Sequence, residues 1–156
     1  MHIVSEQHRE GVRWITVEPQ DWVDVHAQLR AEGSATFDYL TAVHNSNDEF
    51  IVVSHLHGST ECVVRTVITD ACITSLSHVF AVAEFHERET AQMFGITFQG
   101  LGDTSAAFEG VTERALRKDF ALTDRMAVQW PGAVEPDVNA RRRPSLPPGV
   151  FEQWTS

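Results

Sequence analysis

Apolar and polar residues alternate along much of the first seventy residues, and this two-residue period is typical of a half-buried β-strand. The pattern predicts four strands, over residues 12–17, 36–44, 50–57 and 61–68. Short polar connections join the last three, and short turns favour antiparallel neighbours. We therefore expect these three strands to form an antiparallel meander.

Two segments have helical spacing instead. Pro19 suits a first helical turn and Gly33 suits a C-terminal cap, so we expect a helix over residues 19–32. Ser75 is a candidate cap for a second helical region, whose clearest part is residues 83–94. A short extended piece at 96–98 and a loop at 99–115 complete this part.

The chain therefore predicts an α+β fold, with two layers: a mainly antiparallel or mixed sheet and helices packed on one face. From Pro131 the character changes, because five of the six prolines and the run Arg141, Arg142 and Arg143 follow. We interpret residues 1–130 as the folded domain and 131–156 as an arm that is extended or disordered in isolation.

Charge limits the possible partners. The 156 residues carry a formal charge of −10, and the 17 acids and 5 bases of residues 1–113 account for the excess. Such a balance argues against a nucleic-acid binder.

No apolar run is long enough to cross a membrane and no signal peptide is evident, so a cytoplasmic location is the default. Cys62 and Cys72 are too few for a four-cysteine metal site.

Histidines offer one catalytic hypothesis. His55 and His57 are two residues apart on a predicted strand, so they share a face, and His44 or Glu61 is a candidate third zinc ligand. This pattern would suit a small metal-dependent enzyme, but it equally suits two exposed histidines at a strand end. The chain has no G-x-S-x-G, Walker A or G-x-G-x-x-G motif.

An unusual cluster of charges lies within the second helix. Glu87 falls on the stripe that carries Ala83 and Phe94, and Glu89 lies about 200° away around the helix. Glu84 and Arg88 are spaced as an ion pair. One interpretation is a solvated helix with ordinary ion pairs. The other is that the acids meet basic groups of a partner or buried amides, because a buried, unpaired carboxylate is costly.

These residues resemble a known family. Residues 87–98, from Glu87-Arg88-Glu89 through Phe94-Gly95 to Phe98, resemble the signature of the 30 kDa subunit of respiratory complex I, the enzyme that in bacteria is called NADH-quinone oxidoreductase. The second hallmark of that family resembles Arg117-Lys118-Asp119-Phe120, at the expected separation. The family prefers an acid where Gln92 stands.

The resemblance implies a non-catalytic subunit of the hydrophilic arm, peripheral on the cytoplasmic side of the membrane. Its implied partners are the large, 49 kDa-type quinone-site subunit and other hydrophilic-arm subunits. It implies no cofactor in this chain, whereas the whole complex uses NADH and quinone. Equivalent subunits occur in membrane-bound nickel–iron hydrogenases, and a free-standing regulatory domain is a further alternative.

The resemblance also identifies candidate interface residues. The partner would contact the two motifs and, along the tail, three arginines. These residues are Glu87, Arg88, Glu89, Phe94, Gly95, Arg117, Lys118, Asp119 and Phe120, with Arg141, Arg142 and Arg143 in the tail.

Overall fold

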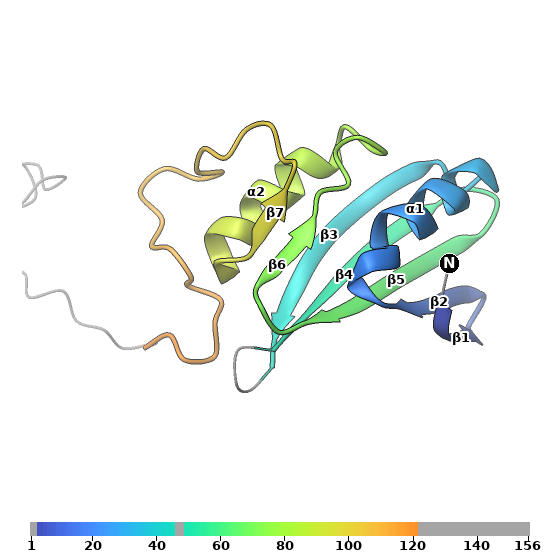
Figure 1. The fold of residues 1–156 in the computed structure, drawn as a ribbon, viewed down its shortest axis with the longest axis horizontal. Coiled ribbons are helices and arrows are strands. Elements are labelled where there is room, and N and C mark those ends of the chain that lie inside the picture. The colour runs from blue at the N-terminus through green and yellow to red at the C-terminus, as the bar shows by residue number, and fades with distance from the viewer. Residues whose placement is uncertain (1–2, 46–48, 122–156) are drawn as a thin grey trace, which may run out of the picture. The chain divides into compact units, whose positions relative to one another are not determined.

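The computed structural model describes residues 3–45 and 49–121 (Figure 1). The first half contains β1 (Ile3–Arg9), β2 (Val12–Val17), a 3-10 turn η1 (Pro19–Asp21), α1 (Trp22–Ala31) and β3 (Thr36–His44). The second half contains β4 (Phe50–His57), β5 (Glu61–Ile68), β6 (Cys72–Thr74), α2 (Ala83–Phe94) and β7 (Thr97–Gln99). All four predicted strands are present with their predicted bounds.

Five of the strands form one mixed sheet in the order β1-β2-β5-β4-β3. The predicted meander is confirmed, since β4 pairs antiparallel with both β3 and β5. The pairing of β2 with β5 is parallel, and the chain between them contains α1, β3 and β4. This crossover places β5, the last strand of the sheet along the chain, in its centre.

Two strands were not predicted. β1 is an edge strand whose side chains are all exposed or half-buried, so its sequence lacks the apolar alternation that marks a strand. β6 has only three residues, and it pairs in parallel with β7 to form a separate two-stranded sheet. The β6–β7 pairing joins segments that are distant in sequence, which local patterning does not reveal.

Helix α1 lies across one face of the sheet (Figure 1). Its sequence places four residues on one side, and the structure buries all of them: Trp22, Val25, His26 and Leu29. The buried imidazole of His26 bonds the carbonyl of Trp22 and the hydroxyl of Ser54, each at 2.6 Å. Burial lowers the pKa of His26 to about 4, because the charged imidazolium loses its hydration. The ring is therefore neutral at pH 7.

Helix α2 packs near β3, where the ring of Phe37 contacts the rings of Phe80 and His86. Both helices thus cover one face, and the predicted α+β class is confirmed. Ser75 does not cap this helix, because turns occupy the segment up to Val82 and α2 begins at Ala83. The helix ends as predicted at Gly95, whose left-handed φ of 73° lets its N–H bond the carbonyl of Ala91.

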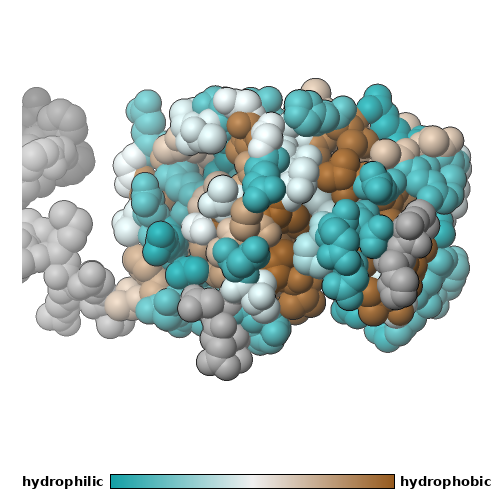
Figure 2. Space-filling model, viewed as in Figure 1, coloured by the Kyte–Doolittle hydropathy of each residue, from teal (hydrophilic) through white to brown (hydrophobic). Residues whose placement is uncertain are grey.

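The surface of the view in Figure 2 is hydrophilic over the end that carries α1 and β1, and hydrophobic side chains gather toward its middle. On the opposite face of the sheet, several apolar side chains are exposed: Trp14, Tyr39, Val43 and Val67. No helix within the described residues is long and apolar enough to cross a membrane.

Candidate functional site at the end of helix α2

The three consecutive charged residues of α2 have three different environments. Successive residues of a helix are 100° apart, so Glu87 points into the protein, Arg88 toward the following loop, and Glu89 toward a half-buried position at the surface. Neither interpretation of the cluster, as solvated or as buried, therefore describes all three residues.

Glu87 is fully buried, with 0% of its surface exposed. One carboxylate oxygen accepts a hydrogen bond from the Ser75 hydroxyl at 2.5 Å, and the other accepts the backbone N–H of Leu76 at 2.6 Å. Burial raises the pKa of Glu87 above its ordinary value, although both hydrogen bonds act in the opposite direction. Glu87 meets a buried amide, as one interpretation proposed, and this amide belongs to its own chain.

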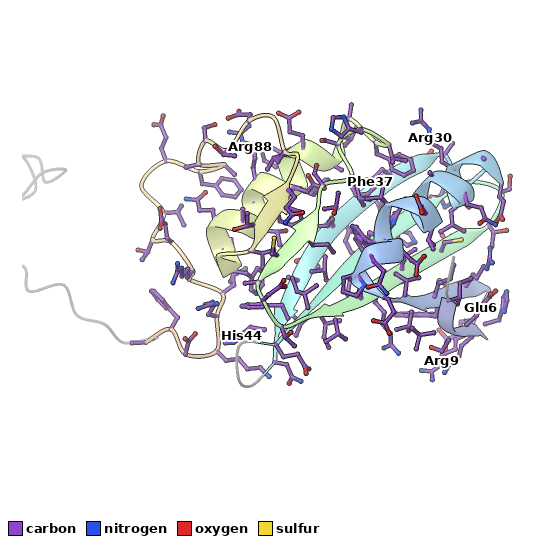
Figure 3. All side chains as sticks on the ribbon, in the orientation of Figure 1. Glu6, Arg9, Arg30, Phe37, His44 and Arg88 are labelled. Carbon is purple, nitrogen blue, oxygen red and sulfur yellow. The ribbon has the colours of Figure 1, made fainter. Side chains whose placement is uncertain are left out.

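Arg88 holds the loop that follows β7, and its position on α2 is labelled in Figure 3. Its guanidinium donates to the carbonyl oxygens of Ser105 and Ala106, at 3.0 and 3.2 Å, and to the Ser105 hydroxyl at 2.8 Å. It also forms an ion pair with Asp103 at 3.2 Å. The predicted pairing with Glu84 is wrong, because the loop uses the guanidinium instead.

Gln92 fixes a second part of the same loop. Its side-chain oxygen accepts the N–H of Phe108 at 2.9 Å, while its NH₂ group donates to the carbonyl of Phe108 at 2.9 Å. The backbone carbonyl of Gln92 accepts the N–H of Arg114 at 2.7 Å. An amide has both a donor and an acceptor, whereas the acid preferred in the family has acceptors only.

The second motif lies against the C-terminal end of α2. Arg117 donates from Nε to the carbonyl of Phe94 at 2.9 Å, and its guanidinium lies 4.9 Å from the centre of the Phe50 ring. A cation at the carbonyl end of a helix is favourable because it complements the helix dipole. The structure therefore brings the two motifs together, through Arg117, at the residue just before Gly95.

His44, at the end of β3, contacts the same motif (Figure 3). Its Nδ1 accepts the backbone N–H of Lys118 at 3.0 Å, and its ring stacks on Phe50 with a centroid distance of 4.9 Å. The Asp119 carboxylate lies 3.8 Å from the same Nδ1 atom, beyond hydrogen-bond distance. The Lys118 side chain is exposed, and Phe120 is half-buried.

A pocket of about 310 Å³ lies between the C-terminal half of α2 and the loop. Six of its lining residues are Arg88, Gln92, Gly95, Leu101, Ser105 and Arg114. The Arg114 side chain packs closely over Gly95, since a Cβ added to that glycine would lie 2.9 Å from Arg114 Nε. The motif glycine is thus favoured by its positive φ, and the flexible Arg114 side chain lies close over it.

The histidine hypothesis gains no support from the geometry. His55 and His57 do share the outer face of β4, but His55 contacts Asp38 at 2.9 Å and His57 contacts Glu61 at 3.3 Å. His44 is engaged by the second motif. Across residues 3–45 and 49–121, no three His, Cys, Asp or Glu side chains lie together as metal ligands would.

Three residues complete this site in roles that the sequence did not predict, namely Ser75, Gln92 and His44. The sequence does give a signal for Gln92, because this residue departs from the family pattern. Ser75 and His44 are far in sequence from the motifs, so only the fold identifies them as partners. The tail arginines Arg141, Arg142 and Arg143, and the proposed boundary at residue 130, lie outside the described residues.

Comparison with known proteins identifies a family. Residues 15–126 match the family model described as respiratory-chain NADH dehydrogenase, 30 Kd subunit. A subunit of the NADH-quinone oxidoreductase of Mesorhizobium japonicum is 32% identical over 128 residues, covering 73% of this chain and 62% of the relative. The corresponding subunit of the Rhodobacter capsulatus enzyme is 29% identical over 142 residues, covering 82% and 70%. The chain spans about 60% of the length of the first of these relatives.

Two solved structures share the fold. A trypsin-resistant fragment of Nqo5 aligns with a TM-score of 0.57 and 22% identity, covering 64% of this chain and 88% of the fragment. A chain of the membrane-bound sulfane sulfur reductase, an archaeal respiratory membrane complex, aligns with a TM-score of 0.66 and 23% identity, covering 76% and 78%.

Proposed function

Because the chain belongs to the family of the 30 kDa subunit of the respiratory-chain NADH dehydrogenase, we propose that it is a non-catalytic subunit of a complex I-like NADH:quinone oxidoreductase. In this proposal it docks onto the large quinone-site subunit, in the hydrophilic arm, on the cytoplasmic side of the membrane. The whole complex would use NADH and quinone. This chain would contribute a rigid surface that positions its neighbours.

The proposal rests on the hydrogen bonds that residues of the two motifs make within the chain. Glu87, Arg88 and Arg117 direct their polar groups to the chain's own backbone and hydroxyl groups. Arg88 and Arg117 thereby fix the long irregular segment after β7 against α2, whereas Glu87 fixes the segment that precedes the helix. A loop of this length is seldom ordered without a reason, and binding is the usual one.

The remaining motif residues divide between the interior and the surface. Phe94 is buried, whereas Lys118 and Asp119 are exposed. We propose that the exposed residues form charge-assisted bonds with a neighbouring subunit, while the buried ones maintain the loop. In this proposal the Lys118 side chain contacts the partner directly. Glu87 acts only indirectly, by holding its own chain in place.

The test is affinity purification of the tagged full chain from membranes of its own host, solubilised in mild detergent. We expect the large quinone-site subunit and other hydrophilic-arm subunits to copurify in constant ratio, identified by mass spectrometry. The same identification distinguishes an NADH-linked complex from a nickel–iron hydrogenase. Recovery of the tagged chain alone, under low and moderate salt, would overturn the proposal.

A further inference from the structure

The solvent-facing side of α2 is more apolar than a solvated helix face requires. Val82 and Phe85, one helical turn apart, have 61% and 49% of their surfaces exposed. Scattered exposed apolar residues are normal on soluble proteins, but a contiguous group marks an interaction site. Whether Val82 and Phe85 belong to an interaction site therefore depends on the residues around them.

The loop extends the apolar surface. The rings of Phe85 and Phe108 meet edge to face, with centroids 6.1 Å apart, and Phe108 is 37% exposed. Gln92 holds Phe108 by two hydrogen bonds and also donates to the carbonyl of Val111, which is 42% exposed. The Gln92 amide thus holds the backbone of Phe108 and Val111 beside the helix that carries Phe85.

One carboxylate lies on this surface. Glu89 is one turn beyond Phe85 and one turn before Gln92, so it is on the same face of the helix. It is half-buried, and within residues 3–45 and 49–121 it has no hydrogen bond or ion pair. The adjacent Arg88 is directed to Ser105 and Asp103 instead. A docked apolar partner would desolvate this charge, which is costly unless the partner supplies a cation.

We propose that Val82, Phe85, Glu89, Phe108 and Val111 form a docking surface, the α2 surface, for a neighbouring protein subunit. The partner places an apolar segment across Phe85 and Phe108 and pairs a lysine or arginine with Glu89. This inference rests on the proposed function and adds the location and chemistry of one contact. A second copy of this chain fits poorly, because a two-fold contact through the same surface brings two Glu89 carboxylates together.

Two variants test the surface, each with a matched control. Glu89→Lys reverses the charge on the α2 surface, and Glu84→Lys makes the same change about 140° away around the helix. Phe85→Ser removes the central ring, and Tyr39→Ser removes a ring of similar exposure from the open face of the sheet. Circular dichroism melting of each purified full chain shows that the fold is retained.

The measured quantity is the amount of large quinone-site subunit recovered per tagged chain. We expect Glu89→Lys and Phe85→Ser to lower it about tenfold or more, since a central interface residue contributes more than about 1.4 kcal/mol. Both controls should stay within about twofold of wild type. Glu89→Gln should weaken the dependence of recovery on salt, because the paired charge is absent.

The outcomes separate the two proposals. If the wild-type chain recovers no oxidoreductase subunit, the proposed function fails. If the wild type recovers them and both surface variants recover equal amounts, the function stands and the α2 surface is refuted. A photo-crosslinking residue at position 85 gives a second readout. Its product should contain a partner peptide with a lysine or arginine among apolar residues, and a crosslinked peptide without a basic residue would contradict the pairing.

Discussion

Removing the buried carboxylate of Glu87 tests the central physical claim about the first motif. In Glu87→Ala, the Ser75 hydroxyl and the Leu76 amide both lose the carboxylate that accepts their hydrogen bonds, inside a fully buried site. A hydrogen bond to a charged group contributes about 1.5–3 kcal/mol. Two such bonds predict a loss of about 3–6 kcal/mol in the free energy of unfolding, a large part of the stability of a domain this size.

The Glu87→Gln variant keeps the shape and separates charge from hydrogen bonding. The amide oxygen can accept from Leu76 while the NH₂ donates to the Ser75 hydroxyl oxygen, and that hydroxyl can donate to Ser77, whose oxygen lies at 2.8 Å. We therefore expect a smaller loss than in the alanine variant, about 1–2 kcal/mol near neutral pH.

The pH dependence has a definite sign. The pKa of Glu87 is raised in the folded state, so its contribution to stability is fully present below pH 4.5 and is lost as pH rises through the folded pKa. Glutamine stays neutral, so the penalty of Glu87→Gln should shrink as pH rises. Urea unfolding of the full chain, followed by circular dichroism between pH 4 and 8, measures both effects. A loss below about 1 kcal/mol in Glu87→Ala, or a penalty that grows with pH, would refute the reasoning.

Further predictions concern the rest of the fold. A Cβ at Gly58 would lie 2.1 Å from the carbonyl oxygen of Gly33, so Gly58→Ala should lower the melting temperature by several degrees; an unchanged melt would contradict this close approach. Gln92→Glu keeps an acceptor for the Phe108 N–H but loses both donors to the loop carbonyls, so the loop should open more readily and hydrogen exchange at Phe108 should accelerate while exchange in β4 is unaffected. The pKa of His26 is about 4, against 6.5 when unfolded, so its contribution is present above pH 6.5 and is lost as pH falls through 4. Relative to His26→Gln, the wild type should lose about 3 kcal/mol over that range, and parallel pH profiles would count against it.

The elements of the fold were predictable where burial follows a local period. β3, β4 and β5 each alternate clearly, and α1 and α2 carry four or five buried residues at helical spacing. β1 was not predictable because its side chains carry no apolar stripe. The parallel pairing of β2 with β5 depends on a crossover, which no local pattern specifies.

The candidate site was predictable in part. The position of Glu87 on the apolar stripe indicated that it needed a polar partner, and the structure supplies Ser75 and Leu76. The helix period also separated Glu87 from Glu89. The hold of Arg88 on Ser105 was not predictable, because it depends on the path of an irregular loop. Long-range hydrogen bonds of this kind are a property of the tertiary structure.

The central position of β5 has a consequence for how the chain is made. At roughly 5–20 residues per second, a ribosome takes several seconds to add the fifty or so residues that separate β2 from the end of β5. Until β5 is made, β2 in the hairpin of β1 and β2, and β4 in the hairpin of β3 and β4, each have an unpaired edge. β5 then pairs with both of these edges. The nascent chain is therefore most exposed to mispairing just before Ile68 emerges, and substitutions in β5 should reduce the yield of folded subunit more than equally buried substitutions in α1.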